Sequence, residues 1–592
     1  MKLLLDCECY LNYFSVGIEN VDTYKKLYFE IHNDDFTNFN MAKVKNLVLN
    51  HTIIGFNLEG YDNPMLKACF AGYSNAQLKQ LSDDIVSSNN LKGWQVDKKF
   101  GLPRINIDYI DLMCISPGFG SLKLRGGRLH SKKLQDLPIE PDAIITVDRA
   151  EKLKDYCING DLELTRDLYE KLIPEIELRE VMSKQYKTNL KTKSDAQIAE
   201  AVFKLALTKA GVDVHRTAIE AGAKFTYKVP SFVTFKSDKF KDALEKVKRA
   251  VFVVNEKGSV LLPKEIASPI PFDGAKYKMG MGGLHSCEKK QSIVAGPNQT
   301  LVDKDVVSYY PSIILNQGLY PQHLTPEFNN VYRAIVEKRI AAKTAGDMVT
   351  SNSLKVVINS SFGKFGNQYS ALYSPELLIQ TTISGQLSLL MLIESLVAIG
   401  VKVYSANTDG IVLLFDNDKT DEVNWVCQEW ENTTGFVLED TFYKALYSRD
   451  VNNYFAVKPN DACKGKGMFT LNSLSKNTAN TICYIAVMDY LIHGKTIEDT
   501  ILNCTDMTKF VSIRTVNGGA VCQGVMIGKA IRWYYSTTTT ECIRYARNDN
   551  KVPKTEGALP MMNLGPIPVD LDYQYYITEA VTILESLGLT YE

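Results

Sequence analysis

Two short acidic segments in apolar β-strands most constrain what this chain can fold into. Asp6 and Glu8 follow an apolar strand at the start of the chain, and Asp303 and Asp305 lie in the strand Leu301–Val307. Because side chains alternate along a strand, the two acids of each pair point to the same face. Close carboxylates such as Asp6 and Glu8 repel one another unless Mg²⁺ or Mn²⁺ neutralises them, although this pattern alone is also typical of a solvated strand end.

The composition is that of an ordinary globular protein, with 45% hydrophobic and 23% charged residues. At 592 residues the chain is too long for one hydrophobic core, so about three to five structural units are expected. The formal net charge of −1 does not indicate nucleic-acid binding, but a local basic groove would hold DNA at any net charge. The cysteines show no C-x-x-C spacing, so we expect reduced thiols in the cytoplasm.

Hydrophobic periodicity predicts a mixed α/β region over residues 1–190 and further helices and strands after it. The apolar segment Leu387–Val403 is interrupted by Glu394 and Lys402, so it predicts a buried helix running into a strand and no membrane span. Strands are predicted at Lys2–Leu5, Thr52–Phe56, Val401–Ser405 and Ile411–Phe415, and helices at Val147–Leu172, 196–211, Asn329–Thr344, Leu354–Phe362, 382–398 and Asn477–His493.

Five further residues place the first acidic pair in a longer pattern. Asn57, Tyr61 and Asp62 fit N-x(2–3)-[F/Y]-D after a strand, and Tyr156 and Asp161 follow on or beside a helix. This order resembles the three exonuclease motifs of the acidic proofreading nucleases. The resemblance implies that Asp6, Glu8, Asp62 and Asp161 hold two divalent ions, that Tyr156 orients the attacking water and that Asn57 contacts the primer strand.

The third exonuclease motif departs from the family pattern. Three residues normally separate its Tyr and Asp, whereas four separate Tyr156 from Asp161. Either Gly160 marks a bulge or helix start that restores the geometry, or Tyr156 is not the residue that positions water. Between the second and third motifs, Ser121-Leu122-Lys123 resembles the family's additional single-strand-binding motif.

The second acidic pair opens a segment that is similar to family B DNA polymerases. Residues 305–312 match D-x-x-S-L-Y-P-S except for Tyr309, and residues 404–410 resemble Y-x-D-T-D-S with Asn407 for the first Asp and Gly410 for Ser. Asp409-Gly410 favours a tight hairpin with Asp409 at its tip. The resemblance implies that Asp305 and Asp409 hold two Mg²⁺ ions, and that Asn407 removes one charge beside them.

The predicted nucleotide site lies between these motifs. Residues 355–363 match K-x-x-x-N-S-x-[Y/F]-G, and helical spacing puts Lys355 and Asn359 on one face with Phe362 and Gly363. Arg339 and Lys343, one turn apart on the preceding helix, are expected to bind the same triphosphate. The resemblance makes Tyr310 the steric gate against a ribose 2′-OH, and the predicted nucleotide-binding residues are Arg339, Lys343, Lys355, Asn359, Tyr310, Ser308 and Tyr309.

Weaker signals indicate contacts with DNA. Gly282 and Gly283 loosely resemble the Y-x-G-G segment that contacts the template, although a glycine cluster is more often only a turn. Tyr454 stands where the family has a K-x-Y primer-binding strand, with Asn452 in place of Lys. Residues 464–467 (Lys-Gly-Lys-Gly) either supply the missing charge or form an exposed turn. Phe362 and Gly363 are expected beside the nascent base pair.

The resemblance covers about residues 1–460 and implies an α/β plus α+β multidomain fold. An RNase H-like exonuclease domain (1–190) would precede a right-hand polymerase. Its parts would be a connector with the first part of the palm (191–328), short helical fingers (329–366), the rest of the palm (367–460) and a thumb (461–592). The short spacings from Asp305 to Lys355 and from Gly363 to Asn407 leave no room for the insertions that bind the terminal protein in protein-primed relatives.

The implied function is a DNA-directed DNA polymerase with 3′→5′ proofreading. It would bind primer–template DNA, dNTPs and single-stranded DNA, with two Mg²⁺ or Mn²⁺ ions in each active site. We expect a monomeric phage or mobile-element replicase in the bacterial cytoplasm that needs helper proteins for strand displacement. Two alternatives stay open. One is an exonuclease with a decayed polymerase half, suggested by Asn407 and Gly410, and the other is a non-catalytic DNA-binding replication factor.

Overall fold

The computed structural model describes residues 1–88, 93–471 and 473–592. The chain forms two compact units, Met1–Ser194 with Leu471–Ala580 and Asp195–Thr470 with Val581–Glu592. Residues 461–592, predicted as one thumb domain, are therefore divided between the units. Strand β19 (Cys463–Lys466) pairs with β18 (Asn453–Val457) of the second unit, whereas the amide of Leu134 donates to the carbonyl of Met562 within the first.

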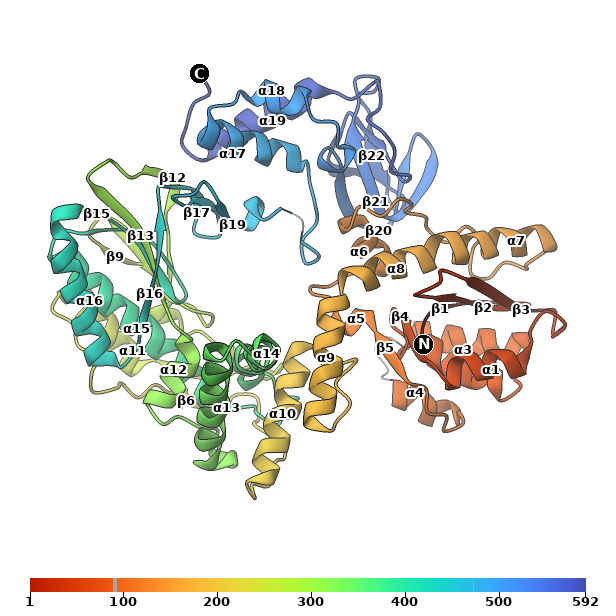
Figure 1. Ribbon diagram of the computed structural model, residues 1–592, viewed down its shortest axis with the longest axis horizontal. Helices are drawn as coiled ribbons and strands as arrows, with labels where there is room; N and C mark the ends of the chain where they lie inside the picture. The colour runs from red at the N-terminus through yellow and green to blue at the C-terminus, as the bar shows by residue number, and fades with distance from the viewer. Residues whose placement is uncertain (89–92, 472) are drawn as a thin grey trace. The chain divides into compact units, whose positions relative to one another are not determined.

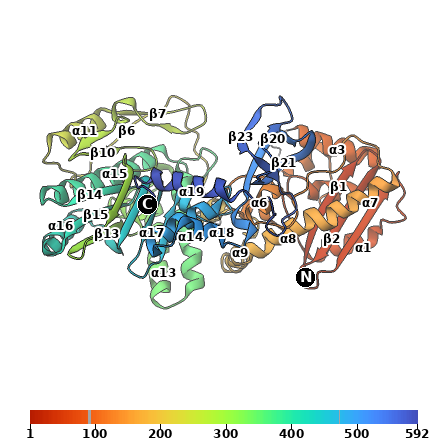
Figure 2. The same ribbon diagram turned by 90° about the horizontal axis from the view of Figure 1, so that it is seen from above.

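A five-stranded sheet with the order β3-β2-β1-β4-β5 lies at the centre of the N-terminal part of the first unit. Strand β1 is antiparallel to β2 and parallel to β4. Leu3 and Leu5 pack with helices on one face, and Leu4 packs on the other against α8. Figure 2 shows the helical segment α7–α8 crossing β1 and β2. The elements are β1 (Lys2–Tyr10), β2 (Tyr13–Asn20), β3 (Lys26–His32), β4 (Thr52–Gly55), β5 (Tyr109–Asp111), α1 (Met41–Leu49), α2 (Asp62–Phe70), α3 (Asn75–Ser87), α4 (Gly93–Phe100), α7 (Val147–Tyr156) and α8 (Leu162–Lys171).

The alternation along β1 puts Asp6 and Glu8 on the α8 face. The prediction that this strand ends at the acids is wrong, because β1 continues to Tyr10. Tyr10 pairs with Tyr13 across a tight turn, and both rings are buried. The acids therefore lie within a paired strand whose position is fixed on both sides.

A second five-stranded sheet, β23-β22-β20-β21-β24, completes the first unit. Its fully buried Arg532 donates hydrogen bonds to the carbonyl oxygens of Ser131, Lys132, Met561 and Met562. This side chain thereby ties the C-terminal sheet to the segment after α6. The elements are α5 (Leu112–Ile115), α6 (Leu122–Arg128), α9 (Ile173–Tyr186), α17 (Thr481–His493), α18 (Ile497–Leu502), β20 (Ser512–Cys522), β21 (Val525–Tyr535), β22 (Cys542–Tyr545), β23 (Lys551–Glu556), β24 (Ala558–Pro560) and α19 (Tyr573–Ser586), whose last residues belong to the second unit.

The second unit is built on a seven-stranded antiparallel sheet with the order β16-β13-β15-β14-β11-β10-β9. Helices α15 (Pro375–Ala398) and α16 (Thr420–Thr434) lie together beside this sheet (Figure 1) and share its core. The strands are β9 (Ile270–Phe272), β10 (Ala275–Lys278), β11 (His285–Ser286), β13 (Gln299–Val306), β14 (Lys402–Asn407), β15 (Gly410–Asp416) and β16 (Leu438–Tyr443).

Helix α15 is the buried apolar helix predicted from the sequence. Within the described ranges it alone has the length and apolar composition to cross a membrane, but 83% of its most apolar stretch is buried inside the protein. It is therefore a core helix of the second unit.

The remaining helices and strands of the second unit surround this sheet. Helices α13 and α14 form an antiparallel pair that packs on α10, where Phe203 stacks on Phe328 and Tyr332. The elements are α10 (Asp195–Lys209), β6 (Lys224–Thr226), α11 (Asp238–Arg249), β7 (Val251–Val254), β8 (Val260–Leu261), β12 (Lys289–Val294), α12 (Tyr309–Asn316), α13 (Glu327–Thr344), α14 (Met348–Phe365), β17 (Ala445–Asp450), β18 and β19.

Candidate active sites

Four acidic side chains meet in the first unit, where α7–α8 covers β1. Carboxylate oxygens of Asp6, Glu8 and Asp161 lie within 4.8 Å of one another. Asp62, in the first turn of α2, accepts a hydrogen bond from the backbone N–H of Cys7 at 3.1 Å, so it lies directly behind β1. The structure brings together the four residues that the sequence predicts as metal ligands.

The electrostatics of this cluster suit a hard divalent cation. Burial raises the pKa of all four carboxyl groups, and repulsion from Glu8 and Asp161 raises the pKa of Asp6 further. Among the described residues, Asp6 Oδ2 and Asp161 Oδ1 are buried without a hydrogen-bond partner. Mg²⁺ and Mn²⁺ prefer oxygen ligands, and buried carboxylate oxygens that lie close together and accept no hydrogen bond are suited to bind them.

The irregular third motif contains a π-helical turn. Cys157–Asp161 forms this turn between α7 and α8, and the hydroxyl of Tyr156 donates to Asp161 Oδ2 at 2.7 Å. A π turn accommodates one more residue than an α turn, which brings Tyr156 and Asp161 together despite the fourth intervening residue. The sequence left open whether a bulge at Gly160 restores the geometry of this motif, and the structure has that bulge.

Lys123 also reaches this cluster, although the sequence indicates its segment only as a single-strand-binding motif. Its Nζ donates to the hydroxyl of Tyr156 at 2.5 Å and lies 3.5 Å from Asp136 Oδ1. Its positive charge lowers the pKa of Asp6, Glu8 and Asp161, in opposition to burial. Lys123 therefore keeps a cation beside the Tyr156–Asp161 pair.

Asp111, which the sequence analysis missed, organises the loop that carries Asn57. Its buried carboxylate accepts backbone N–H groups of Asn57 at 2.8 Å and Met113 at 3.0 Å. Asn57 has a φ of +66°, a left-handed conformation that costs energy unless neighbouring bonds hold it. The half-buried Asn57 thus precedes Asp62 in a loop fixed by Asp111. An acid at the end of the buried strand β5 was the available signal.

The second unit brings Asp305 and Asp409 to one cleft. Asp305 on β13 pairs with Gly410 at the start of β15, and the amide of Val306 donates to the carbonyl of Asp409 at 2.7 Å. Thr408, at a φ of +65°, and Asp409 form the predicted turn between β14 and β15. The cleft has a volume of about 390 Å³, and the acids share its lining with Asn407, Tyr454, Lys464 and Lys466.

The two departures from the polymerase motif have structural consequences here. A Cβ at Gly410 would overlap Asp305 Oδ1, so glycine leaves room for the carboxylate. The side-chain amide of Asn407 donates to the carbonyl of Val451 at 2.8 Å, which ties the end of β14 to the residues before β18. Neither substitution removes Asp305 or Asp409 from the cleft.

Lys464 supplies a positive charge to the same cleft. Its Nζ lies 3.0 Å from Asp303 Oδ2 and 3.7 Å from Asp305 Oδ2, and the hydroxyl of Tyr443 donates to Asp303 Oδ2 at 2.8 Å. Burial and the charge of Asp303 raise the pKa of Asp305 to about 6, while Lys464 opposes this rise. Burial also raises the pKa of Asp409. The ion pair with Lys464 thus compensates the negative charge of Asp303. Asp305 and Asp409 fit as the oxygen ligands of a divalent cation.

Several predicted nucleotide-site residues meet beside this cleft. The ring of Tyr310 stacks on Phe362, with centroids 4.1 Å apart, and its hydroxyl donates to the carbonyl of Gly282 at 2.7 Å. Arg339 on α13 donates to the hydroxyl of Ser308 at 3.4 Å. Gly283 lies against the turn of β14 and β15, since a Cβ there would come within 2.9 Å of Thr408 Cγ2.

The structure buries one further predicted residue of this site and leaves the others exposed. Tyr309, predicted to bind the nucleotide, is 4% exposed and donates its hydroxyl to the carbonyl of Gly385. Its side chain belongs to the core, because adjacent residues of helix α12 point about 100° apart and only Tyr310 faces outward. Lys343, Lys355, Asn359 and Gly363 are exposed on α13 and α14.

Comparisons with known proteins give a likeness in structure at low sequence identity. No protein-family model matches the chain, and no curated protein matches it. Among solved structures, the family B DNA polymerase from the hyperthermophilic archaeon Pyrobaculum calidifontis is similar, with a TM-score of 0.43 and 14% sequence identity. The match covers 99% of this chain and 77% of that chain.

Proposed function

We propose that this chain is a DNA-directed DNA polymerase that also carries a 3′→5′ exonuclease. The observation that carries the proposal is the joint placement of Asp305 and Asp409 in one cleft of the second unit. Tyr310 lies nearby, and burial, followed by the charge of Asp409, raises its pKa. A separate carboxylate cluster in the first unit supports the nuclease half.

For synthesis, the side chains of the second unit would divide the work. Asp305 and Asp409 would hold divalent ions. These ions would lower the pKa of the primer 3′-OH and stabilise the pyrophosphate leaving group. Arg339 and Lys355, from two packed helices, would offset the charge of the triphosphate. Tyr310 is held at its ring and at its hydroxyl, so it makes a rigid wall that excludes a ribose 2′-OH.

For degradation, Asp6, Glu8 and Asp62 would hold the divalent ions with Asp161. The hydroxyl of Tyr156, already oriented by Asp161, would position the attacking water. Lys123 would attract the scissile phosphate and offset the charge that develops on it. These roles require the Tyr156–Asp161 hydrogen bond, and so depend on the π turn.

Primer extension on a 5′-labelled primer–template with Mg²⁺, with and without dNTPs, tests the proposal. We expect Asp409→Ala to lose extension only, Asp6→Ala to lose shortening only, and the exposed control Asp418→Ala to keep both. A wild-type protein that shortens but never extends primers would favour the decayed polymerase instead. Extension without shortening would refute the nuclease half, and neither activity would leave a DNA-binding scaffold.

A further inference from the structure

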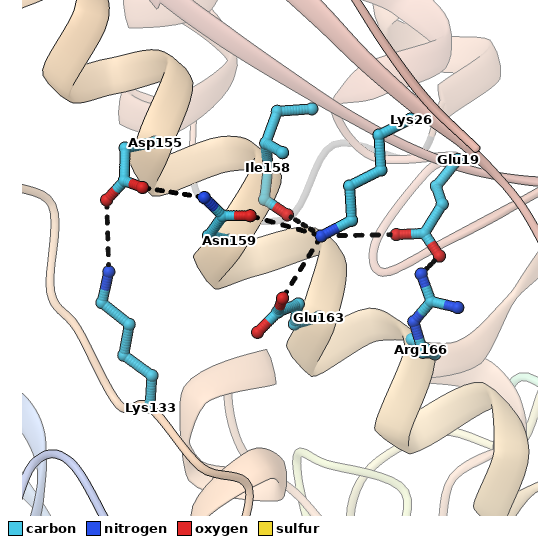
Figure 3. Close-up of polar contacts among 8 residues, drawn as sticks. All are labelled: Glu19, Lys26, Lys133, Asp155, Ile158, Asn159, Glu163 and Arg166. Carbon is cyan, nitrogen blue, oxygen red and sulfur yellow. Dashed lines mark hydrogen bonds and ion pairs between the residues drawn. The ribbon is translucent and has the colours of Figure 1, made fainter. Parts of the chain in front are cut away.

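A lysine of strand β3 contacts the π turn. Lys26, at the start of β3, donates from Nζ to the backbone carbonyl of Ile158 at 2.8 Å (Figure 3). The same Nζ lies 3.4 Å from Asn159 Oδ1 and 3.2 Å from Glu163 Oε1. Lys26 is thus bonded to the turn itself and to the first turn of α8.

The carbonyl that Lys26 binds is the one that the π turn leaves without its helical donor. In an α-helix the N–H of Leu162 would donate to the carbonyl of Ile158, four residues before it. Here that N–H donates to the carbonyl of Cys157, five residues before it. A buried or half-buried carbonyl without a donor is unfavourable, and the ammonium group of Lys26 supplies one.

Two further contacts hold the same segment on the sheet. Fully buried Glu19 of β2 forms an ion pair with Arg166, one turn into α8, and lies 3.9 Å from Lys26 Nζ (Figure 3). Gly17 of β2 permits the close approach, since a Cβ there would clash with Cys157 Sγ. Strands β2 and β3 therefore contact the turn and the helix after it.

The chain needs a stabilised π turn because four residues, and not three, separate Tyr156 from Asp161. In a regular α-helix, residues five apart point about 140° away from one another, whereas residues four apart point about 40° apart. An α-helical 157–161 segment would therefore turn Asp161 away from Tyr156 and break their 2.7 Å hydrogen bond.

We propose that Lys26 is a positioning residue for the exonuclease, an inference that rests on the nuclease half of the proposed function. By binding the carbonyl of Ile158 it stabilises the π turn, and the turn keeps Tyr156 bonded to Asp161. Lys26 touches neither substrate nor the reacting atoms. Its effect reaches the site through the backbone of residues 157–161.

Epistasis between Lys26 and the extra residue tests this inference. Deletion of the exposed Asn159 restores three intervening residues and an α-helical register, which no longer needs Lys26. Degradation of a 5′-labelled single-stranded oligonucleotide would be measured for Lys26→Met, for the deletion, for the combination and for Lys25→Met, a matched control at the exposed neighbour.

We expect Lys26→Met to lower kcat by about 10- to 100-fold with KM unchanged, the loss caused by a misplacement of about 1 Å. The combined variant should return to within about threefold of the deletion alone, and Lys25→Met should match the wild type. Lys26→Met with wild-type kcat, or a combined variant as slow as Lys26→Met, would overturn the inference. Primer extension with dNTPs controls for folding of the preparations.

A crystal structure of Lys26→Met tests the same inference independently of activity. We expect the Tyr156 hydroxyl to lie more than about 3.5 Å from the Asp161 carboxylate, beyond hydrogen-bond distance. An unchanged π turn with the hydrogen bond intact would refute the role of Lys26, even if the wild type proved to have no exonuclease. A wild type without exonuclease but with a relaxed turn in Lys26→Met would refute only the proposed nuclease function.

Discussion

Replacing Gly410 with alanine should disable synthesis through a single steric contact. A Cβ at this position would lie 3.1 Å from Cγ of Asp305 and 3.3 Å from Asp303 Oδ1, and would overlap Asp305 Oδ1. Ordinary contacts between carbon atoms are about 3.5–4.0 Å, so the Asp305 carboxylate must move by about 1 Å. Asp303 cannot yield easily because Lys464 and Tyr443 hold it.

A displacement of about 1 Å at a catalytic group costs about 100-fold in rate, or about 2.7 kcal/mol in transition-state stabilisation. We therefore expect Gly410→Ala to incorporate dNTPs about 100-fold more slowly in single-turnover primer extension. The backbone φ of Gly410 is not positive, so alanine can adopt the same backbone conformation and the fold should persist.

The exonuclease of the same preparation is the internal control, because its residues lie in the other unit. Gly565→Ala, where a Cβ would meet open space, controls for the exchange of glycine for alanine. Wild-type extension by Gly410→Ala would refute the steric argument. An equal loss of exonuclease, or a lowered melting temperature, would show that the substitution disturbs folding instead.

Three further predictions concern other parts of the molecule. Lys123→Met removes the charge that lowers the pKa of Asp6, Glu8 and Asp161, so the acidic limb of the exonuclease pH–rate profile should move to higher pH; an unmoved limb would refute this role. Tyr310→Ala should incorporate ribonucleotides that the wild type rejects, which single-nucleotide extension with rNTPs measures. Arg532→Met should lower the free energy of unfolding by about 2 kcal/mol or more, measured in urea, because the buried carbonyls of Ser131 and Met561 lose the donor that Arg532 supplies.

The carboxylate cluster of the first unit was partly predictable and partly not. The alternation Asp6-Cys7-Glu8 depends only on neighbours in one strand, so the sequence placed both acids on one face correctly. The sequence did not predict that Asp111 and Lys123 lie near the acids, because that proximity arises from packing between separate elements. Their residue types alone indicate only a strand end and a basic helix position.

The polymerase-like cleft shows the same division. The sequence predicted the hairpin at Asp409, since Asp-Gly between apolar strands favours a tight turn whatever surrounds it. It named Tyr310 as the steric gate but also placed Tyr309 among the nucleotide-binding residues, because only burial against α15 makes Tyr309 a core residue. The bond between Lys464 and Asp303 joins residues 161 positions apart, and no local pattern encodes it.

The sequence by itself determined the strands, the turns and the helical periodicity that present the acids, because neighbouring residues fix them. It also exposed the extra residue between Tyr156 and Asp161 but could not say how the chain accommodates it. Only the tertiary structure decided that, because the donor that the π turn needs comes from Lys26, 132 positions away from Ile158. An unpaired carbonyl needs a hydrogen-bond donor, and neighbouring carboxylates need a positive charge. Folding brings these groups near from distant parts of the chain, so no local sequence pattern encodes them.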